Sequence, residues 1–165
     1  METRGTNVNA TWGFIADGLF TSQAEIEDHA TQFGTVNVGD IKYRDLNGDG
    51  VIDNYDKTVI GRGDVPRIYY GFGADLQIGD FSISALFQGT GQASTTISGI
   101  GAYEYASQGV FNDIHMHAWT PERYANNERI DYPALSLHET TSHRANSFFV
   151  MDRSYLRLKN IEIAY

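Results

Sequence analysis

The sequence predicts an all-β protein of antiparallel strands and long loops, and three observations support this class. The 165 residues include 10 tyrosines and 9 phenylalanines, which fit the surface of a pleated sheet. They also include 17 glycines against only 3 prolines, which suits turns and bulges between strands. Apolar and polar residues alternate from Ile68 to Gln92, which is the period of a strand with two different faces. The length fits one domain.

The first elements are expected to be short. Residues 6–14 alternate loosely and predict a weak strand, with Val8, Ala10, Trp12 and Phe14 on one side. Residues 15–40 are typical of a loop that holds one short helix between Ser22 and His29, which either Thr21 or Ser22 could cap. Glu25 follows Ser22 by three residues, which is the spacing of a capping box.

An acidic motif lies between Asp45 and Asp56, with the spacing of a calcium-binding loop. Such a loop places oxygen ligands at positions 1, 3, 5, 9 and 12, uses the carbonyl of position 7 and turns at a glycine in position 6. The candidate ligands are Asp45, Asn47, Asp49, Val51 through its carbonyl, Asp53 and Asp56, with Gly50 at the turn. Position 12 is the shorter Asp, as in dockerin-type loops, so bidentate binding is less favoured. The alternative is an acidic turn without an ion.

Residues 68–92 predict a β-hairpin. Gly79 and Asp80 form a two-residue turn, because Gly at the first turn position accepts a positive φ. The two strands share an apolar face made by Tyr70, Phe72, Ala74, Leu76, Ile78, Phe81, Ile83, Ala85 and Phe87. Either a soluble sheet or a membrane barrel has such a pattern, since one face of a barrel meets lipid and the other the lumen.

Two further stretches bear on this choice. Residues 93–153 are polar and irregular, and a loop of this length opposite a short turn is typical of outer-membrane barrels. Residues 154–165 predict another strand, in which Leu156 and Leu158 have one phase while Ile161 and Ile163 have the other. The slip at Lys159-Asn160 indicates a bulge. No apolar run is long enough for a transmembrane helix, but a barrel strand needs only about 9–11 residues.

Composition excludes several classes of function. The formal net charge of −9 argues against nucleic acid as a partner, because phosphate binding needs a basic surface. The absence of cysteine excludes disulfides and thiolate metal sites. No phosphate-binding glycine loop, nucleophile elbow or distinct acid/base pair is present in the sequence, so we expect no enzymatic activity.

Several stretches together resemble the C-terminal part of SusC/RagA-type TonB-dependent transporters of Bacteroidetes. They occur in the order of that family, and they are GFIADGLFTSQAEI (13–26), GDIKYRDLNGDGVIDNYDKTVIG (39–61), YYGFGADLQIGDFSISALFQGTGQ (69–92), WTPERYANNERIDYPALS (119–136) and SYLRLKNIEIAY (154–165). The resemblance covers nearly the whole chain. It implies that residues 1–165 are part of a transmembrane β-barrel in the outer membrane.

The resemblance also implies a topology and partners. Residues 15–67 and 93–153 would be extracellular, residues 68–92 and 154–165 would lie in lipid, and a SusD-like lipoprotein and TonB would act in import of oligosaccharides or peptides. Neither a plug nor the closing strands of a barrel of about 22 strands is recognised in the sequence, so we expect one part of a larger barrel. The alternative is a soluble calcium-binding β-module for glycan binding or adhesion.

Overall fold

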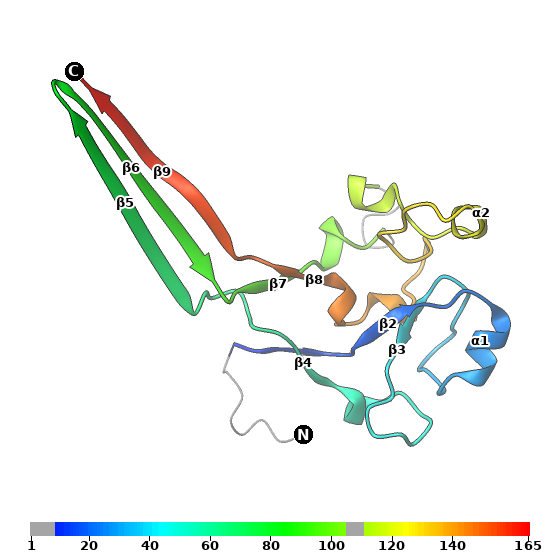
Figure 1. Cartoon of the computed structure of the whole chain (residues 1–165). Coiled ribbons are helices and arrows are strands. Elements are labelled where there is room, and N and C mark those ends of the chain that lie inside the picture. Colours follow the sequence, from blue (N-terminus) through cyan, green and yellow to red (C-terminus); the bar gives the residue numbers. More distant parts are fainter. Residues whose placement is uncertain (1–8, 105–110) are drawn as a thin grey trace.

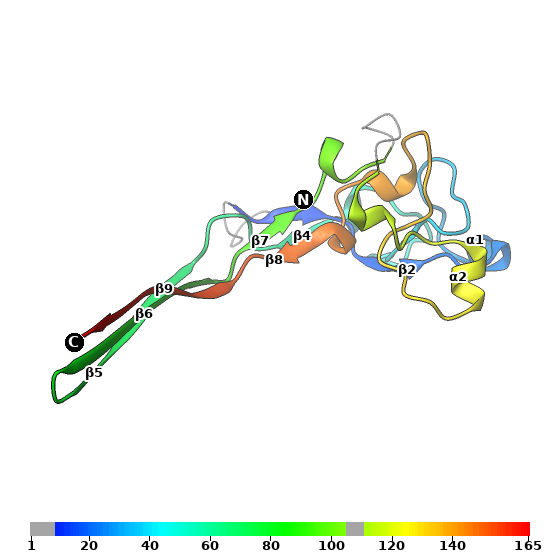
Figure 2. The same cartoon turned by 90° about the horizontal axis from the view of Figure 1, so that it is seen from above.

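The computed structural model describes residues 9–104 and 111–165. A long three-stranded sheet extends from a compact region of short strands, helices and loops (Figure 1). We call β5, β6 and β9 the projecting sheet, and the described residues before β5 and between β6 and β9 the body. A view at right angles shows the same separation, with the projecting sheet as a thin layer beside the body (Figure 2).

Most regular elements are strands, and the helices are short. The strands are β1 (Thr11–Gly13), β2 (Ala16–Leu19), β3 (Ile41–Tyr43), β4 (Thr58–Gly61), β5 (Ile68–Ile78), β6 (Phe81–Gly91), β7 (Ser94–Thr96), β8 (Val150–Asp152) and β9 (Tyr155–Ala164). The α-helices are α1 (Gln23–Asp28) and α2 (Pro121–Ala125). Single turns of 3-10 helix are η1 (Asn54–Asp56), η2 (Gly99–Gly101), η3 (Asp113–His115), η4 (Thr141–His143) and η5 (Ser147–Phe149).

The projecting sheet has the strand order β5-β6-β9, and both of its pairings are antiparallel. The pairing of β5 with β6 runs without a break from Ile68 opposite Gly91 to Ile78 opposite Phe81. Gly79 and Asp80 form the turn, and Gly79 has φ +61°, as a two-residue hairpin requires. The predicted class of antiparallel strands is therefore present, but the described residues form no closed barrel.

The expected slip in the last strand is a β-bulge. Leu86 pairs with Asn160, whereas its neighbour Phe87 pairs with Leu158, so Lys159 is the extra residue. The bulge reverses the alternation of β9. As a result, Leu158 on one side of the bulge and Ile161 on the other lie on the same face of the sheet.

The part of the body next to the projecting sheet consists of two short ribbons. β1 pairs with β4, and β7 pairs with β8, and both pairings are antiparallel. The two ribbons are connected by a hydrogen bond of 2.8 Å from the amide of Ser94 to the carbonyl of Gly63. Of the strand expected over residues 6–14, the structure contains β1, while residues 6–8 lie outside the described residues.

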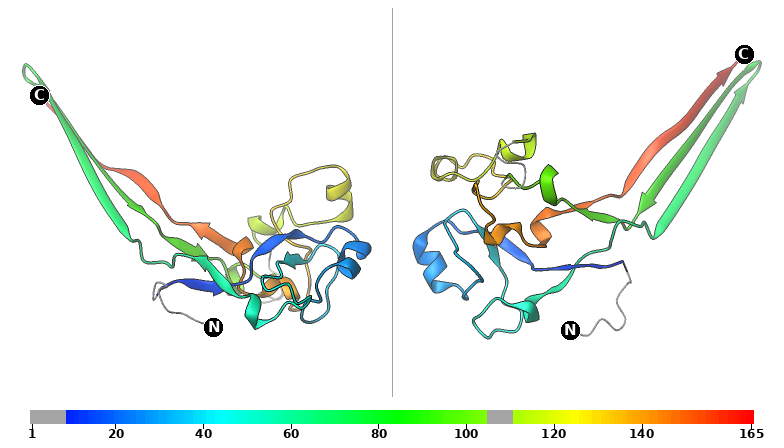
Figure 3. Two further views of the ribbon diagram at one scale, coloured as in Figure 1. Left: turned by 60° about the horizontal axis from the view of Figure 1, so that its bottom comes forward. Right: turned by 180° about the vertical axis from the view of Figure 1, so that it is seen from behind.

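The body has one hydrophobic core, to which both long connections contribute. Its members from the first 67 residues are Phe14, Ile41, Tyr43 and Ile52, and those from residues 93–153 are Ala102, Tyr103, Ala118, Tyr132 and Phe149. The views in Figure 3 show yellow and orange segments beside blue and cyan ones. The two stretches expected as loops thus fold together, and the sequence did not predict this.

Helix caps account for where α1 and α2 begin. Of the two candidate caps, Ser22 caps α1 by accepting a hydrogen bond from the amide of Glu25 at 3.2 Å, which is one half of the predicted capping box. The carboxylate of Glu25 accepts from the amide of Thr21 at 2.8 Å and pairs with Lys42 of β3. Thr120 caps α2 ahead of Pro121. None of the helices in the described part of the chain is long and apolar enough to cross a membrane.

Candidate functional site

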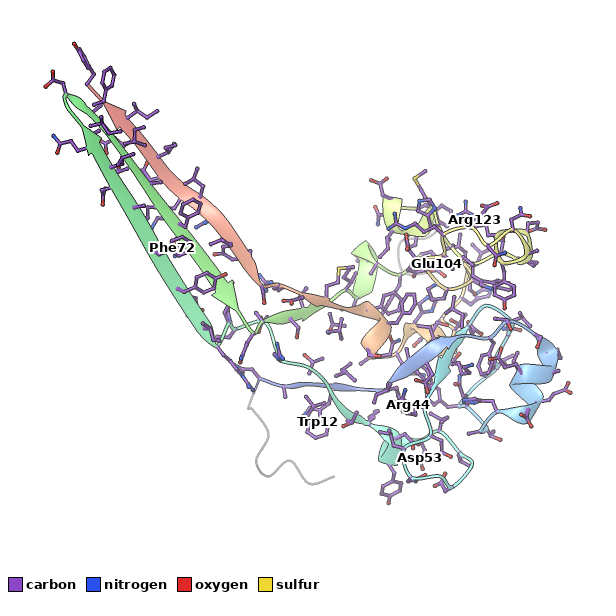
Figure 4. The ribbon with its side chains drawn as sticks, viewed as in Figure 1. Trp12, Arg44, Asp53, Phe72, Glu104 and Arg123 are labelled. Carbon is purple, nitrogen blue, oxygen red and sulfur yellow. The ribbon has the colours of Figure 1, made fainter. Side chains whose placement is uncertain are left out.

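The projecting sheet has one apolar face that crosses all three strands. Register places Phe72, Phe87 and Leu158 in one row, and the two phenylalanine rings stack with centroids 5.1 Å apart. The other rows on this face are Leu76, Ile83 and Ile163; Ala74, Ala85 and Ile161; Tyr70, Gly89 and Leu156; and Ile78 with Phe81. Figure 4 shows Phe72 on the projecting sheet, well away from the labelled residues of the body.

This apolar face is not covered by any other described element. The exposed fraction is 54% for Phe72, 56% for Leu76 and 68% for Ile163. Soluble monomers rarely expose a continuous apolar surface of this kind, and such a surface marks contact with another protein or with a membrane.

The opposite face of the same sheet is mostly polar, with Leu86 as an apolar exception. One row joins Asp75, Ser84 and Glu162, and another joins Gln88 to Arg157. Each strand has 10 or 11 residues, which is the length that crosses a hydrocarbon layer in a tilted strand. The two faces therefore suit two different environments, lipid on one side and water on the other.

The acidic loop is bent by hydrogen bonds from its own backbone. The Asp45 carboxylate accepts from the amide of Gly48 at 2.7 Å and from that of Gly50 at 2.8 Å. These bonds, that from Gly50 foremost, lower the pKa of Asp45. Asn47 accepts from the amide of Asp49 at 2.9 Å. Gly48 and Gly50 have φ values of +75° and +82°, so the turn depends on glycine.

The second half of the loop is built around a buried carboxylate. Asp56 is fully buried, and it accepts from the amide of Leu46 at 2.8 Å and from that of Asp53 at 2.8 Å. Asp53 in turn accepts from the amide of Tyr55 at 2.7 Å and caps η1. Asp56 therefore joins the two ends of the loop. Figure 4 shows Asp53 at the edge of the body.

Val51, the expected carbonyl ligand, lies in a bridge to Thr31. Thr31 donates to the carbonyl of Gly50 and accepts from the amide of Ile52, both at 2.9 Å, so neither bond uses the carbonyl of Val51. The loop therefore attaches to the body through backbone bonds on either side of Val51.

The donor chemistry of the loop fits calcium, which prefers carboxylate, amide and carbonyl oxygens. A carboxylate has about four acceptor sites, so backbone bonds leave capacity for an ion. In the part of the chain that the structure describes, however, no three His, Asp or Glu side chains are grouped closely enough to hold a metal. Calcium binding would therefore require the loop's carboxylates to converge.

A buried polar cluster in the body was not foreseen from the sequence. The Glu104 carboxylate accepts from the Tyr132 hydroxyl at 2.7 Å and from the Ser136 amide at 2.8 Å, and lies 3.2 Å from Nε2 of His143. Burial opposes ionisation of Glu104, but hydrogen bonds from His143, Tyr132 and Ser136 outweigh it and lower its pKa to about 2. These partners are 28 to 39 residues away in the chain, so no local pattern reveals the cluster.

Comparison with known proteins relates the chain to two receptors of the same kind. No family model matches the chain. The TonB-dependent receptor P26 of Formosa agariphila is 34% identical over 163 residues, or 98% of this chain and 16% of that protein. The TonB-dependent receptor P3 of the same organism is 28% identical over 162 residues, or 98% of this chain and 15% of that protein.

The chain thus spans about a sixth of each relative's length. Both relatives are named as receptors and not as enzymes. Over nearly all of its length, this chain is a distant homologue of part of the TonB-dependent receptors.

Proposed function

We propose that the chain forms part of the wall and extracellular loops of a SusC/RagA-type TonB-dependent transporter in the outer membrane. The observation that carries the proposal is the projecting sheet, whose strands have membrane-spanning length, an apolar face and a polar face. Homology to two TonB-dependent receptors supports it. A soluble β-module would leave the apolar face exposed to water, which costs free energy.

The same proposal assigns sides of the membrane. The Gly79-Asp80 turn is at one end of the projecting sheet and the body is at the other (Figure 1). Short turns of outer-membrane barrels face the periplasm and long loops face outward. Residues 15–67 and 93–153 are accordingly extracellular in this proposal. Transport itself belongs to the whole protein, with TonB supplying energy, a SusD-like lipoprotein as partner and oligosaccharides or peptides as substrates.

We propose in addition that the acidic loop binds calcium through Asp45, Asn47, Asp49, the Val51 carbonyl, Asp53 and Asp56. The support is the spacing of these oxygen donors and the two left-handed glycines that bend the loop. Ion binding would neutralise carboxylates that repel one another and would stabilise this edge of the body.

The topology can be tested with single cysteines, because these 165 residues contain none, and any cysteine elsewhere in the transporter would first be replaced by serine. We would place one cysteine at Asp80 in the turn and another at Leu137, which is 76% exposed in the body. The whole transporter would be expressed in its host, and intact cells would be treated with a membrane-impermeant maleimide.

Leu137→Cys should be labelled on intact cells, and Asp80→Cys only after the outer membrane is permeabilised. The protein without an added cysteine is the control for background labelling. Equal labelling of both positions on intact cells, or the reverse pattern, would overturn the proposal.

A further inference from the structure

Two buried histidines of the body accept a hydrogen bond through the same ring nitrogen. His115 is 4% exposed and His143 is 7% exposed. Nδ1 of His115 accepts from the amide of Asn112, and Nδ1 of His143 accepts from the amide of Thr140, both at 2.9 Å. In each case the amide belongs to the residue just before a 3-10 turn, η3 or η4, and the histidine is the last residue of that turn. The same local arrangement therefore occurs twice in residues 93–153.

These contacts fix the protonation state of both rings. A backbone amide can only donate, so Nδ1 is the acceptor and carries no proton. A neutral imidazole then has its one proton on Nε2. Nε2 of His115 donates to the carbonyl of Ala102 at 2.9 Å, and Nε2 of His143 donates to the carboxylate of Glu104 at 3.2 Å. Both histidines are therefore neutral in the folded body.

Both of these donor bonds end on the same buried segment, residues 102–104. None of its three residues is more than 7% exposed. The ring of Tyr132 meets His115 edge to face with centroids 4.6 Å apart, and the ring of Tyr103 lies 4.9 Å from that of His143. The two histidines thus attach η3 and η4 to the centre of the core.

The surroundings of His115 contain no compensating charge. Its neighbours are the Ala102 carbonyl and the rings of Tyr132 and Phe111, the latter with centroids 5.8 Å apart. Within the described residues, His115 forms no ion pair with a carboxylate. Asp113 belongs to the same turn, but it is exposed.

A second proton would affect the two rings differently. On His115 it would set an N–H group against the amide N–H of Asn112 and leave a positive charge buried without a carboxylate, and both effects cost free energy. On His143 the charge would meet the carboxylate of Glu104. His115 contacts only the ring of Tyr132, whose hydroxyl donates to Glu104 at 2.7 Å. His115 is therefore the more sensitive of the two.

We propose that His115 is an acid-sensitive latch, whose protonation releases residues 112–118 from Ala102 and opens this part of the body. The projecting sheet is not involved, so the latch would loosen the body alone. The inference goes beyond the proposed transporter function and does not depend on it, because it concerns contacts inside the body only.

The pH at which the latch opens follows from proton linkage. An imidazole in water takes up a proton below about pH 6.5. The closed latch has no place for that proton, so the open or unfolded chain binds one proton more, and the closed state loses stability as the pH falls. This range lies above the one in which Glu104 is protonated, so the two effects can be separated.

The first test is nuclear magnetic resonance of the full chain, labelled with nitrogen-15, in detergent micelles. At pH 7.5 the ring-nitrogen shifts should show the proton on Nε2 in both His115 and His143. As the pH falls, the exposed His138 should take up a proton near pH 6.5 while the fold persists. His115 should stay neutral there, and its protonation at lower pH should coincide with loss of the folded amide signals of residues 112–118. Single His→Gln variants assign the signals.

The second test is urea unfolding of wild type and His115→Gln between pH 5 and pH 7.5. Below about pH 6.5, the folding equilibrium constant of wild type should fall relative to that of the variant, by up to about tenfold per pH unit. His138→Gln is the matched control and should follow wild type. Only the change of the difference with pH is used, so a constant loss of stability in His115→Gln does not disturb the test.

Three results would overturn the inference. They are a proton on Nδ1 of His115 at pH 7.5, protonation of His115 near pH 6.5 with the fold unchanged, and a difference between wild type and His115→Gln that is constant over the whole pH range. If His115→Gln does not fold, the resonance titration of wild type decides alone. The cysteine labelling tests the transporter function separately.

Discussion

The ring of Tyr70 on β5 lies over Gly89, its cross-strand partner on β6. A Cβ atom at residue 89 would lie 2.3 Å from Cζ of Tyr70 and 2.5 Å from the carbonyl oxygen of Tyr155. The Tyr70 hydroxyl donates to that same carbonyl at 3.1 Å. The glycine therefore makes room for a ring that ties together all three strands of the projecting sheet. This row is at the end of the sheet that adjoins the body.

Gly89→Ala should destabilise the projecting sheet, because the methyl group would displace the Tyr70 ring or the backbone of β9. Overpacking of this kind costs about 1–3 kcal/mol. Gly91→Ala is the matched control, since a Cβ there would lie 3.6 Å from Ile68, which is ordinary contact. Urea unfolding of the detergent-solubilised protein measures both, and equal effects would contradict the role of Tyr70.

Phe72→Arg should destabilise the protein in a bilayer by about 2–4 kcal/mol if the apolar face meets lipid near the membrane midplane. Gln77→Arg places the same charge on the polar face of the same strand and should be tolerated. Reversible unfolding from lipid vesicles gives both values. If Phe72→Arg were as well tolerated as Gln77→Arg, the apolar face would not be in lipid.

Acid should weaken the body through Glu104. Its pKa in the folded state is about 2 against an ordinary value of 4.5, so its ionised form is stabilised by folding. This stabilisation is complete above about pH 4.5 and is lost as the pH falls from there toward 2.

The measurement is the unfolding midpoint of wild type and Glu104→Gln between pH 2 and pH 6. The difference between the two should shrink as the pH falls through this window. Glu122→Gln, on the exposed surface of α2, controls for loss of a negative charge. A difference that does not change with pH would mean that ionisation of Glu104 does not stabilise the folded protein.

Calcium should protect the acidic loop from proteolysis. An ion at a hundredfold its dissociation constant stabilises the folded loop by about 2.7 kcal/mol, and a chelator should remove the protection. Asp49→Ala should abolish the difference in protection while leaving the Gly79-Asp80 hairpin intact. Asp64→Ala, which lies outside the loop, should leave the difference unchanged.

Magnesium should substitute poorly for calcium, because it requires near-octahedral geometry and loses its waters reluctantly. If calorimetry showed no binding signal at millimolar calcium, the loop would be an acidic turn that does not bind the ion.

The sequence predicted those features that depend on near neighbours. Alternation of apolar and polar residues predicted the hairpin, because successive side chains of a strand point to opposite faces. The break in that alternation at Lys159-Asn160 predicted the bulge in β9. The cap at Ser22 followed from its spacing to Glu25.

Features that depend on distant partners were beyond the sequence. Trp119 is buried, and its ring lies so close to Gly39 that a Cβ atom there would clash with it, although the two residues are 80 positions apart in the chain. No pattern in the sequence near Glu104 indicates that Tyr132 and His143 are its hydrogen-bond partners, because they lie 28 and 39 residues away.

The shared core of the body has a consequence for assembly. Tyr43 and Phe14 precede the hairpin in the chain, while Tyr132 and Phe149 follow it, so the core cannot close until both flanks have been synthesised. Long-range closure is slow, because the entropy of the intervening segment is lost before its contacts are gained. In the proposed barrel, the hairpin would have to cross the bilayer as one unit, because otherwise its two flanks would lie on opposite sides of the membrane and the core could not form. Resistance of the body to protease would then show that both flanks lie on the same side.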